Sequence, residues 1–291
     1  MAVLCLGKFD ALHRGHRALV ERAEASWPGA AIALLSFTGM AEALGWPVRE
    51  PLVAPRDRAR ILSTWPGAPR EVRLPFADIR ELDLEGFCAV VKDRLAPSAL
   101  VVGEDFRGGR DRSGDAAALV SAAAAQGISV AVVDAVTCAG AAVSSSRVRA
   151  ALGIGDGTLA ADLLGRPHRL IATVVRGDGR GRSLGFPTAN CAARENLAPG
   201  SGVYAGRARL AAAHAGPDRW WPAAINIGHL PTVGGDRPLT VEAHLVGFSE
   251  DCYGARIEIE FLRRLRGEQR FASLEALKAQ IAVDVAAAAI G

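Results

Sequence analysis

Apolar residues in the first half of the chain come in short runs, separated by longer segments in which apolar positions recur three or four residues apart. The runs predict β-strands and the spaced segments predict helices. Strands that alternate with helices are typical of a parallel, doubly wound α/β sheet, a Rossmann-like fold. The predicted strands are residues 3–6, 32–37, 72–74, 100–102 and 129–133.

The pattern changes after helices that we predict at residues 146–152 and 159–164. Beyond Arg166-Pro167, strand-like runs follow one another with only Gly, Pro and Asp turns between them. Such a series predicts a small antiparallel β-barrel. The predicted barrel strands are residues 170–175, 203–210, 223–227, 239–245 and 256–261.

A helix is predicted to close the chain. Residues 273–289 carry apolar side chains at helical spacing, and Ser273 is a plausible N-cap. The turn-rich stretch Gly153-Ile154-Gly155-Asp156-Gly157 indicates a domain boundary. We therefore predict an α/β domain at 1–152, a linker at 153–166 and a barrel domain with a C-terminal helix at 167–291.

Composition narrows the class of ligand. The net charge of +3 comes from 34 basic and 31 acidic residues, a balance that argues against nucleic-acid or membrane-surface partners and suits phosphorylated small molecules. The five cysteines are scattered without CxxC spacing, so we expect neither disulfides nor a zinc site, and a reducing cytoplasm is the expected compartment. No secretory leader and no membrane-spanning apolar run is recognised in the sequence.

A glycine-rich stretch in the second half points to nucleotide chemistry. Gly177-Asp178-Gly179-Arg180-Gly181-Arg182 precedes Gly185-Phe186-Pro187-Thr188-Ala189-Asn190. Such a turn exposes backbone N–H groups that can cradle phosphate. Thr188 and Asn190 are two residues apart, so on an extended strand both oxygens face one side. This pattern suits a magnesium-nucleotide site.

A second phosphate-handling pattern, His13-Arg14-Gly15-His16, follows the first predicted strand and opens a helix at about Arg14. Aligned N–H dipoles and imidazole donors there suit ATP phosphates, although each histidine alone is equally compatible with a polar loop residue. Two such sites in one chain suggest two consecutive reactions on one substrate.

Two further segments carry candidate residues. The run Ser144-Ser145-Ser146-Arg147-Val148-Arg149 offers hydroxyls and guanidinium groups for a leaving pyrophosphate, or else is a serine-capped helix with solvated arginines. After the strand at 100–102, Asp105 is placed to orient a substrate. Phe106 has the shape to meet a flat ring, but we expect its side chain to point into the core.

These stretches together resemble the nucleotidyltransferase superfamily and, more specifically, the bifunctional riboflavin kinase/FAD synthetases of prokaryotes, over nearly the whole chain. The kinase half is similar at residues 181–190, at Gly202-Val203-Tyr204-Ala205, at Asn226-Ile227-Gly228 with Pro231-Thr232-Val233-Gly234, and at Val241-Glu242-Ala243-His244. The adenylylating half is similar at Gly7-Lys8-Phe9-Asp10, at the HxGH stretch, at residues 102–107 and at the serine-arginine run.

The resemblance implies that the barrel phosphorylates riboflavin with ATP to give FMN, and that the first domain joins AMP from a second ATP to FMN, giving FAD and pyrophosphate. It implies Mg²⁺ as cofactor, held by Thr188 and Asn190, and Glu242 as the base that takes the proton of the ribityl hydroxyl. Glu242 is also compatible with a half-exposed strand glutamate. The catalytic residues implied for adenylylation are His13, His16, Arg147 and Arg149.

Binding residues are implied in the same way. The nucleotide-binding set is Gly7, Phe9, Asp10, Gly15, Ser144, Ser145, Gly177, Gly181, Arg182, Gly185, Pro187, Thr188 and Asn190. The flavin-binding set is Asp105, Phe106, Tyr204 and Arg266. Riboflavin, FMN, FAD and ATP are thus the expected ligands, while the oligomeric state is not predicted.

The chain departs from the usual family pattern at Asp10-Ala11-Leu12-His13, at residues 36–46 and at Gly108, where a phenylalanine is usual. The first two replacements look like the plastid-type FAD synthetases of plants. Two alternatives to a double activity stay open: retention of one activity only, and a catalytically idle flavin-binding protein.

Overall fold

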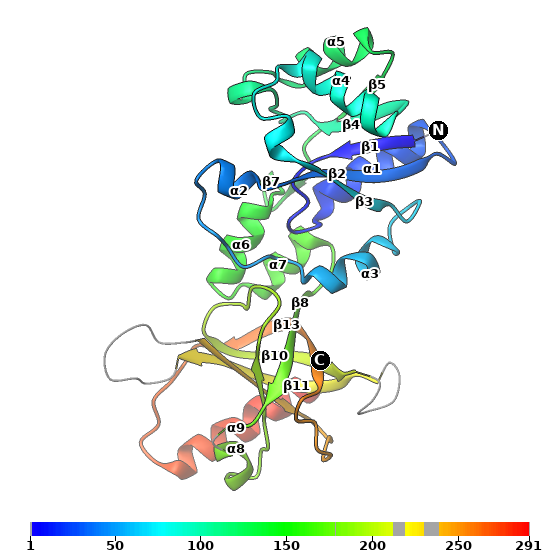
Figure 1. Ribbon diagram of the computed structural model, residues 1–291. Helices are drawn as coiled ribbons and strands as arrows, with labels where there is room; N and C mark the ends of the chain where they lie inside the picture. Colours follow the sequence, from blue (N-terminus) through cyan, green and yellow to red (C-terminus); the bar gives the residue numbers. More distant parts are fainter. Residues whose placement is uncertain (1, 178, 212–218, 230–238, 291) are drawn as a thin grey trace. The chain divides into compact units, whose positions relative to one another are not determined.

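The structure is a computed structural model that describes residues 2–177, 179–211, 219–229 and 239–290 (Figure 1). The chain divides into two compact units. We call Met1–Arg49 with Arg56–Ser144 the sheet unit, and Glu50–Pro55 with Ser145–Gly291 the barrel unit. The motif at residues 231–234 and Asp178 lie outside the described residues. The predicted boundaries at 152 and 166 stay predictions.

The sheet unit is built on five parallel strands in the order β3-β2-β1-β4-β5. This confirms the doubly wound α/β fold that the alternation of strands and helices predicted. The strands are β1 (Ala2–Leu6), β2 (Ala31–Thr38), β3 (Arg70–Pro75), β4 (Ala99–Gly103) and β5 (Ser129–Val133), with a small antiparallel pair of β6 (Thr137–Cys138) and β7 (Ala141–Ala142).

Helices cover both faces of this sheet (Figure 1). Helix α1 (Arg14–Ser26) contacts β1, β4 and β5, and the helices α4 (Leu84–Leu95) and α5 (Ala116–Ala125) pack on the other face through a shared apolar core. Side chains of Asp83 and Asp115 accept hydrogen bonds from backbone N–H groups and cap α4 and α5. The shorter helices are α2 (Met40–Ala43), α3 (Arg58–Leu62) and the 3₁₀ turns Pro55–Asp57, Phe76–Asp78 and Arg110–Arg112.

The sheet order brings the carboxyl ends of β1, β2 and β4 together. Strand β1 has β2 on one side and β4 on the other. The chain therefore builds the sheet outward from β1 in one direction through β2 and β3, and in the opposite direction through β4 and β5. Ligands of open α/β sheets bind at such a switch point. The loops after these strands are therefore the segments of the sheet unit to inspect for a site.

The barrel unit contains a closed, antiparallel barrel with strand order β10-β11-β12-β9-β8-β13, which confirms the predicted barrel. Helix α9 (Leu274–Ala289) closes it, capped by Ser273 as predicted. Its other elements are α6 (Ser145–Gly153), α7 (Gly157–Leu164), β8 (His168–Val175), α8 (Arg180–Ser183), β9 (Ala189–Ala192), β10 (Gly202–Leu210), β11 (Trp221–His229), β12 (Leu239–Leu245) and β13 (Arg256–Arg266).

Glycine permits the closest strand contact in the barrel. A Cβ atom on Gly206 of β10 would lie 2.1 Å from the carbonyl oxygen of Glu260 on β13, and the register of these two strands shifts beside it. Any larger residue would therefore push the strands apart. The segment 50–55 is also tied to this unit, because Leu197 N donates to Pro51 O at 2.9 Å.

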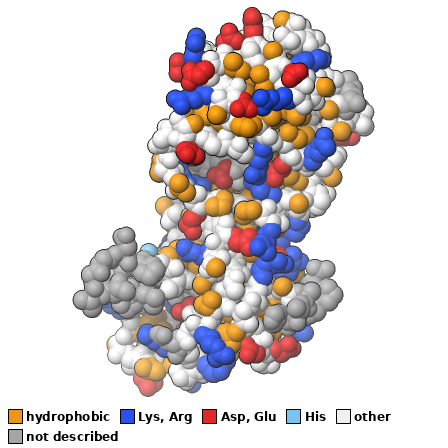
Figure 2. All heavy atoms as spheres, viewed as in Figure 1, with side chains coloured by type: hydrophobic (Ala, Val, Ile, Leu, Met, Phe, Trp, Pro, Cys, Tyr) orange, Lys and Arg blue, Asp and Glu red, His pale blue; other side chains and the backbone are white. Residues whose placement is uncertain are grey.

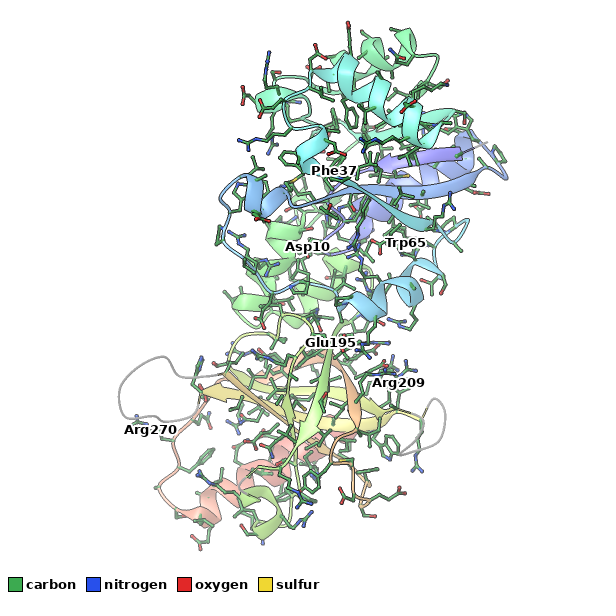
Figure 3. All side chains as sticks on the ribbon, in the orientation of Figure 1. Asp10, Phe37, Trp65, Glu195, Arg209 and Arg270 are labelled. Atoms are coloured by element: carbon green, nitrogen blue, oxygen red, sulfur yellow. The ribbon has the colours of Figure 1, made fainter. Side chains whose placement is uncertain are left out.

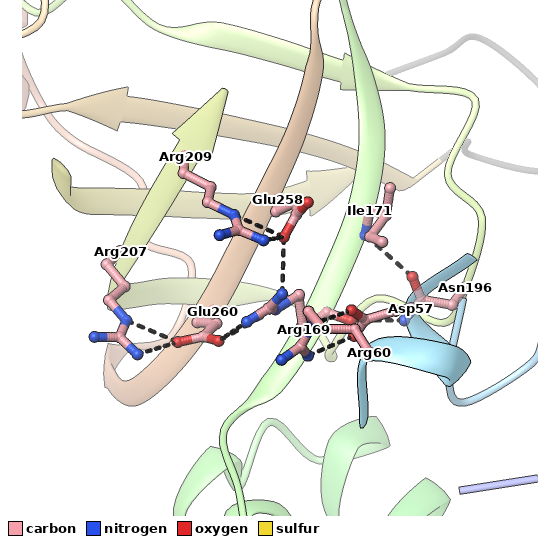
Figure 4. Close-up of polar contacts among 9 residues, drawn as sticks. All are labelled: Asp57, Arg60, Arg169, Ile171, Asn196, Arg207, Arg209, Glu258 and Glu260. Carbon is pink, nitrogen blue, oxygen red and sulfur yellow. Dashed lines mark hydrogen bonds and ion pairs between the residues drawn. The ribbon is translucent and has the colours of Figure 1, made fainter. Parts of the chain in front are cut away.

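A charged network lies on the face of the barrel strands that points away from the core (Figure 4). Arg169 on β8 pairs with both Glu258 and Glu260 of β13, while Arg207 and Arg209 of β10 pair with one glutamate each. The glutamates are largely shielded from water, so these shared guanidinium contacts are needed to compensate their burial. The network joins three neighbouring strands.

Charges on the surface are mixed. Figure 2 shows Lys and Arg side chains interspersed with Asp and Glu over the visible face of both units. This agrees with the small net charge of the sequence.

Candidate active sites

Three polar side chains lie side by side on the outer face of the barrel. In the register of the sheet, Glu242 on β12 stands opposite Asn190 on β9 and opposite Asn226 on β11. Their neighbours Ala189 and Ala243 belong to the buried core. Because successive side chains of a strand point to opposite faces, the three polar groups point outward.

Thr188 shares that face with Asn190. Its Oγ1 donates a hydrogen bond of 3.4 Å to Oε2 of Glu242. A hydroxyl, an amide and a carboxylate thus converge from β9 and β12, and all are oxygen donors of the kind that Mg²⁺ binds. The sequence had indicated the first two residues by their spacing and the third only by resemblance.

A cavity of about 620 Å³ opens beside Thr188 and Asn190. The glycine-rich stretch forms one wall, including Gly177 and Gly181, and three arginines contribute positive charge. One of them, Arg194, has a buried Nη1 with no hydrogen-bond partner among the described residues. An anionic ligand in this cavity would satisfy that donor. The arginines are Arg176, Arg180 and Arg194.

Two glycines, which have no side chain, shape this cavity. A Cβ on Gly177 would lie 2.3 Å from Nδ2 of Asn190, and one on Gly181 would lie 2.5 Å from the carbonyl oxygen of Phe186. The amide of Asn190 therefore packs directly on the backbone of Gly177. Part of the predicted turn is the single helical turn α8, which begins after Gly179 with φ of 72°.

A second cavity of about 400 Å³ lies on the other side of Thr188. Its walls are mostly apolar and come from the loop after α8, from β10 and β11, and from helix α9. Its polar lining includes Arg266, Glu268 and Asp284. An apolar slot with a few placed polar groups is typical of a site for a small ring compound.

The two cavities share a border. Arg180, Gly181, Thr188 and Glu242 line both of them. A ligand in the apolar cavity and one in the polar cavity would thus meet at Thr188 and Glu242, which is the arrangement that direct transfer between two substrates needs.

Arg266, predicted to bind flavin, lines the apolar cavity and is engaged by helix α9. Its guanidinium group forms a 2.7 Å ion pair with Asp284, and Gln280 Nε2 also donates to that carboxylate at 3.0 Å. Both partners of the pair are mostly buried. Arg266 therefore holds helix α9 at the cavity, in addition to lining it.

Tyr204, the other predicted flavin ligand of this unit, lies elsewhere. Its side chain is fully buried in the barrel core, packs edge-on against Phe261, and donates its hydroxyl hydrogen bond to the carbonyl of Gly200. Strand alternation explains this placement, since the preceding residue, Val203, is the one that lines the apolar cavity. Tyr204 has a structural place in the core, and its role as a flavin contact stays a prediction.

The loop before β9 is fixed by a residue that the sequence reading did not single out. Nδ1 of His244 lies 2.8 Å from the carbonyl oxygen of Pro187, and the His244 ring meets Phe186 edge-on at 5.7 Å. Arg182 is exposed and lines neither cavity, whereas Gly185 has a left-handed backbone with φ of 89°. These two predicted residues shape the loop rather than line the described cavities.

In the sheet unit, the segment after β1 is tightly bent. Phe9 is buried and has φ of 50°, while a Cβ on Gly7 would lie 3.1 Å from its ring. His13 caps α1, its Nδ1 accepting from His16 N at 3.3 Å, and the two imidazole rings stack with centroids 3.7 Å apart. The HxGH stretch thus stands at a helix N-terminus, as the sequence indicated.

An arginine supports this bend. Arg58 Nη2 donates to the carbonyl of Phe9 at 2.8 Å, and the same guanidinium group pairs with Glu71 on β3. A non-glycine residue with positive φ is strained, so this contact helps to hold Phe9 in place. Gly15 packs against the His13 ring, where a Cβ would be 3.1 Å from Cε1. Asp10, which Figure 3 labels, directly follows Phe9 in the sequence.

A third cavity, of about 460 Å³, lies at the ends of β1, β2 and β4. Five aromatic rings line it, among them Phe37 from β2, which Figure 3 labels, and Phe106 after β4. Phe106 also packs against the core, so both of its predicted environments occur together. A Cβ on Gly108 would lie 2.5 Å from the Phe106 ring, so the glycine is required by this ring position. Asp105 is exposed beside it.

The serine-arginine run starts helix α6. Ser144 precedes the helix, Ser145 is its first residue, and Arg147 and Arg149 lie in its first turns, all partly buried. The helix is fixed by burial of Val148 and the following apolar residues. The predicted start at residue 146 is therefore one residue late.

Two buried cysteines, Cys5 and Cys191, have unreactive thiols, and Cys191 lines the polar cavity. Burial raises the pKa of the Cys5 thiol to about 12, and burial, together with nearby Cys252 and Glu242, raises that of Cys191 to about 12. Both thiols stay protonated at neutral pH and are poor nucleophiles. Among the described residues, no cluster of three or more His, Cys, Asp or Glu side chains is arranged to hold a metal ion.

Comparison with known proteins identifies the family. A riboflavin kinase family model matches residues 164–290, and an FAD synthetase family model matches residues 1–147. The chain is 37% identical over 290 residues to the bifunctional riboflavin kinase/FMN adenylyltransferase of Pseudomonas fluorescens, covering 98% of this chain and 91% of that protein. This chain belongs to the bifunctional riboflavin kinase/FMN adenylyltransferase family. The resemblance, the two-part fold and the two enzymatic activities predicted from the sequence are thereby confirmed.

Other relatives agree. The Escherichia coli K12 member of the family is 35% identical, over 97% of this chain and 90% of its own length. FAD synthetase 2 of Arabidopsis thaliana chloroplasts is 40% identical over 222 residues, covering 69% of this chain and 59% of the plant protein. This similarity agrees with the plastid-like departures noted in the sequence.

A solved structure from Streptococcus pneumoniae, described as a macrolide-efflux protein, matches the fold with a TM-score of 0.85 and 26% identity, over 97% of this chain and 92% of that one. Its description is not transferred to this family member. Within the described ranges of this chain, no helix has the length and apolarity to span a bilayer.

Several site residues were given no role from the sequence. Arg194 follows β9, His244 lies on β12 and Asp284 on α9, and only the folded barrel places them at the cavities. Arg58 is separated from Phe9 in the sequence by α1, β2, α2 and the 3₁₀ turn Pro55–Asp57. Long-range packing, rather than local spacing, determines these positions.

Proposed function

We propose that the barrel unit binds ATP in the polar cavity and riboflavin in the apolar cavity, with transfer at their shared border. The observation that carries this proposal is that two cavities of opposite character meet at Thr188 and Glu242. The flavin ring suits apolar walls, and the triphosphate suits arginines and glycine-loop amides.

Phosphorylation then proceeds at Glu242. Its carboxylate takes the proton of the terminal ribityl hydroxyl, whose oxygen attacks the γ-phosphorus of ATP; the new C–O–P linkage forms as the bond to the bridging β,γ-oxygen breaks, and FMN and ADP result. The hydrogen bond from Thr188 keeps the carboxylate oriented toward the border of the cavities.

We propose Mg²⁺ as the cofactor of this step. The donor set fits: Thr188 and the amide oxygen of Asn190 are hard oxygen ligands beside a cavity with an unsatisfied arginine donor. Mg²⁺ keeps few protein ligands and takes the rest from phosphate and water, which agrees with the lack of a larger acidic cluster among the described side chains. When bound it would neutralise phosphate charge.

For the second step we propose that the HxGH stretch binds ATP. His13 and His16 stand at the N-terminus of α1, where N–H dipoles favour phosphate. A phosphate oxygen of FMN attacks the α-phosphorus of ATP, a P–O–P linkage forms, and the bond to the bridging α,β-oxygen breaks to release pyrophosphate. Arg147, Arg149, Ser144 and Ser145 stay the residues predicted from the sequence to balance the charge of pyrophosphate.

The flavin of this second step is proposed to occupy the aromatic cavity of the sheet unit. Phe106 lines that cavity, and Asp105 follows the same strand. The scattered cysteines favour a reducing compartment such as the cytoplasm, and the predictions of no nucleic-acid and no membrane partner stay predictions.

A product assay tests the proposal. Purified protein is incubated with riboflavin, ATP and Mg²⁺, and the flavins are separated by chromatography. We expect FMN to form first and FAD to follow. FMN without FAD would mean that only the kinase is active, and binding of riboflavin with neither product would favour an idle flavin-binding protein.

A further inference from the structure

Two cations without an acidic partner in the described part of the chain lie at the aromatic cavity of the sheet unit: Arg112 lines it, and Lys8 contacts its lining residue Trp46. Lys8 is the second residue after β1, and Arg112 ends the 3₁₀ turn in the loop after β4. Partial burial of the ammonium group and the positive charge of Arg112 both lower the pKa of Lys8. Neither residue forms an ion pair with any acidic side chain in the described part of the chain.

Lys8 is held at this position by an aromatic ring. Its Nζ lies 4.1 Å from the centroid of the Trp46 ring, and Trp46 lines the aromatic cavity. A cation over an indole face is attracted by the ring electrons. The charge of Lys8 therefore lies against an aromatic wall of the cavity.

Arg112 is held by the backbone of its loop. Gly108 and Gly114 exchange backbone hydrogen bonds of 2.9 and 3.0 Å, which close the loop into a ring. Inside it, Asp111 and Arg112 both have positive φ, 56° and 58°. Two consecutive left-handed residues other than glycine cost free energy, so this loop shape lowers the stability of the fold.

Two other arginines that line the cavity have polar partners. Arg80 pairs with Glu81 at 3.2 Å, and Arg107 donates to the carbonyl of Phe106 at 2.8 Å. Asp111 also lines the cavity. Lys8 and Arg112 are the like charges left without a polar partner among the described residues. A bound anion would attract both cations and offset the repulsion between them.

We propose that Lys8 and Arg112 form the site for the phosphate group of FMN, with Trp46 as the wall that positions Lys8 beside the flavin ring. This inference rests on the proposed adenylylation of FMN. The ring and the phosphate belong to one ligand, and Arg112 and the Lys8-bound Trp46 both line the aromatic cavity. ATP is the other source of phosphate, and the experiment distinguishes the two.

The test compares Lys8→Met and Arg112→Met with Lys92→Met, which removes the same charge from an exposed position on α4. Adenylylation is measured with FMN and ATP varied in turn. Lumiflavin, which has the ring but no phosphate and no hydroxyl to be phosphorylated, serves as a competitor of FMN.

We expect Lys8→Met and Arg112→Met each to raise the KM for FMN about tenfold or more, as loss of a charge-assisted contact implies. The KM for ATP and the inhibition constant of lumiflavin should change by no more than about twofold, and Lys92→Met should change nothing. Riboflavin phosphorylation by the same variants reports that the chain is folded.

Three results would overturn the inference. An unchanged KM for FMN would show that the cations do not bind its phosphate. A rise in the KM for ATP alone would assign them to ATP, and a parallel loss of FMN and lumiflavin binding would show that Lys8 only shapes the cavity.

Failure of the proposed function is a separate result, seen when the wild-type protein makes no FAD from FMN and ATP. Equilibrium dialysis with FMN then decides the inference, because the barrel site contributes equally to the wild type and to Lys8→Met. Weaker binding by the variant would support the phosphate site, and equal binding would refute it.

Discussion

The hydroxyl of Thr188 donates to the carboxylate of Glu242 across 3.4 Å, at the border that two cavities of opposite polarity share. The contact orients one oxygen of the carboxylate and leaves the other for a substrate. An outward-facing strand glutamate thereby becomes suited to accept a proton from a ligand in the apolar cavity.

Replacing Glu242 by glutamine should abolish this proton transfer with little change in shape. We predict that Glu242→Gln lowers the rate of FMN formation by roughly 10²–10⁴-fold, the usual contribution of a general base. FAD formation from supplied FMN should be unchanged, since Glu242 is not among the residues assigned to that step. Initial rates of both reactions, followed by flavin chromatography, measure this.

The matched control is Glu250→Gln, at an exposed position that lines neither cavity of the barrel unit. It should leave both rates unchanged. Loss of both activities in a folded Glu242→Gln protein would mean that the two steps are not divided between the units as proposed.

Gly177 offers a test of the nucleotide cavity that changes no polar group. A Cβ at this position would lie 2.3 Å from Nδ2 of Asn190, so Gly177→Ala must displace the amide. We predict that the KM for ATP in riboflavin phosphorylation rises about tenfold, since a displacement of a binding group by about 1 Å weakens its contact with the substrate. Gly153→Ala, where the added Cβ meets nothing within 4 Å, is the control. A normal KM for ATP in Gly177→Ala would argue against a role for Asn190 in binding.

The buried ion pair between Arg266 and Asp284 links helix α9 to the apolar cavity. We predict that Asp284→Asn destabilises the barrel unit by about 3–5 kcal/mol, because it leaves the guanidinium group buried without its counter-charge. Where the variant folds, the KM for riboflavin should rise as α9 loosens. Urea unfolding and kinase kinetics measure the two effects.

An exposed pair provides the contrast. Arg17 and Glu21 are each about half exposed on α1, and Glu21→Gln should change the free energy of unfolding by less than about 1 kcal/mol. Equal effects of Glu21→Gln and Asp284→Asn would show that burial of the second pair has no energetic weight.

Thiol reactivity gives a prediction from the pKa shifts. With pKa values of about 12, the Cys5 and Cys191 thiols should resist alkylation by iodoacetamide at pH 8 in the folded protein and react after unfolding. Since folding raises these pKa values, the stability that they contribute is complete below the ordinary pKa of about 8.5 and declines as the pH rises toward 12. Peptide mass spectrometry of labelled protein checks the reactivity, and rapid labelling of Cys191 without unfolding would contradict it.

The sequence was sufficient where local pattern determines structure. The strand at residues 129–133 and the Ser273 cap are found where they were predicted, since alternation, apolar runs and capping chemistry are local. The helical turn α8 was missed because glycine disfavours helix and its turn is held by the surrounding loop. The burial of Tyr204 in the core was not predicted, because a motif names residues without fixing which face of a strand they occupy.

The same distinction explains which site residues were found. Thr188 and Asn190 are close in sequence and share one face, so spacing alone placed them together. The pairing of Lys8 with Trp46, or of Arg266 with Asp284, depends on loops and a helix that meet only after folding. Long-range contacts of this kind have no periodic signal in the chain.

His244 belongs to this second group, and its contact with Pro187 leads to a last prediction. The bond from the imidazole to the Pro187 carbonyl, 2.8 Å long, fixes the residue just before Thr188, while Phe186 packs edge-on against the same ring. His244→Phe keeps an aromatic ring and removes the hydrogen bond; His244→Asn keeps a donor at a similar distance from the backbone. If the bond positions Thr188, His244→Phe should raise the KM for ATP in the kinase step several-fold, by roughly the 1 kcal/mol of a lost hydrogen bond, and His244→Asn should recover part of the loss. FAD formation from FMN should be equal in both variants. Equal kinase kinetics for the two variants would indicate that ring packing, and not the hydrogen bond, sets the position of Thr188.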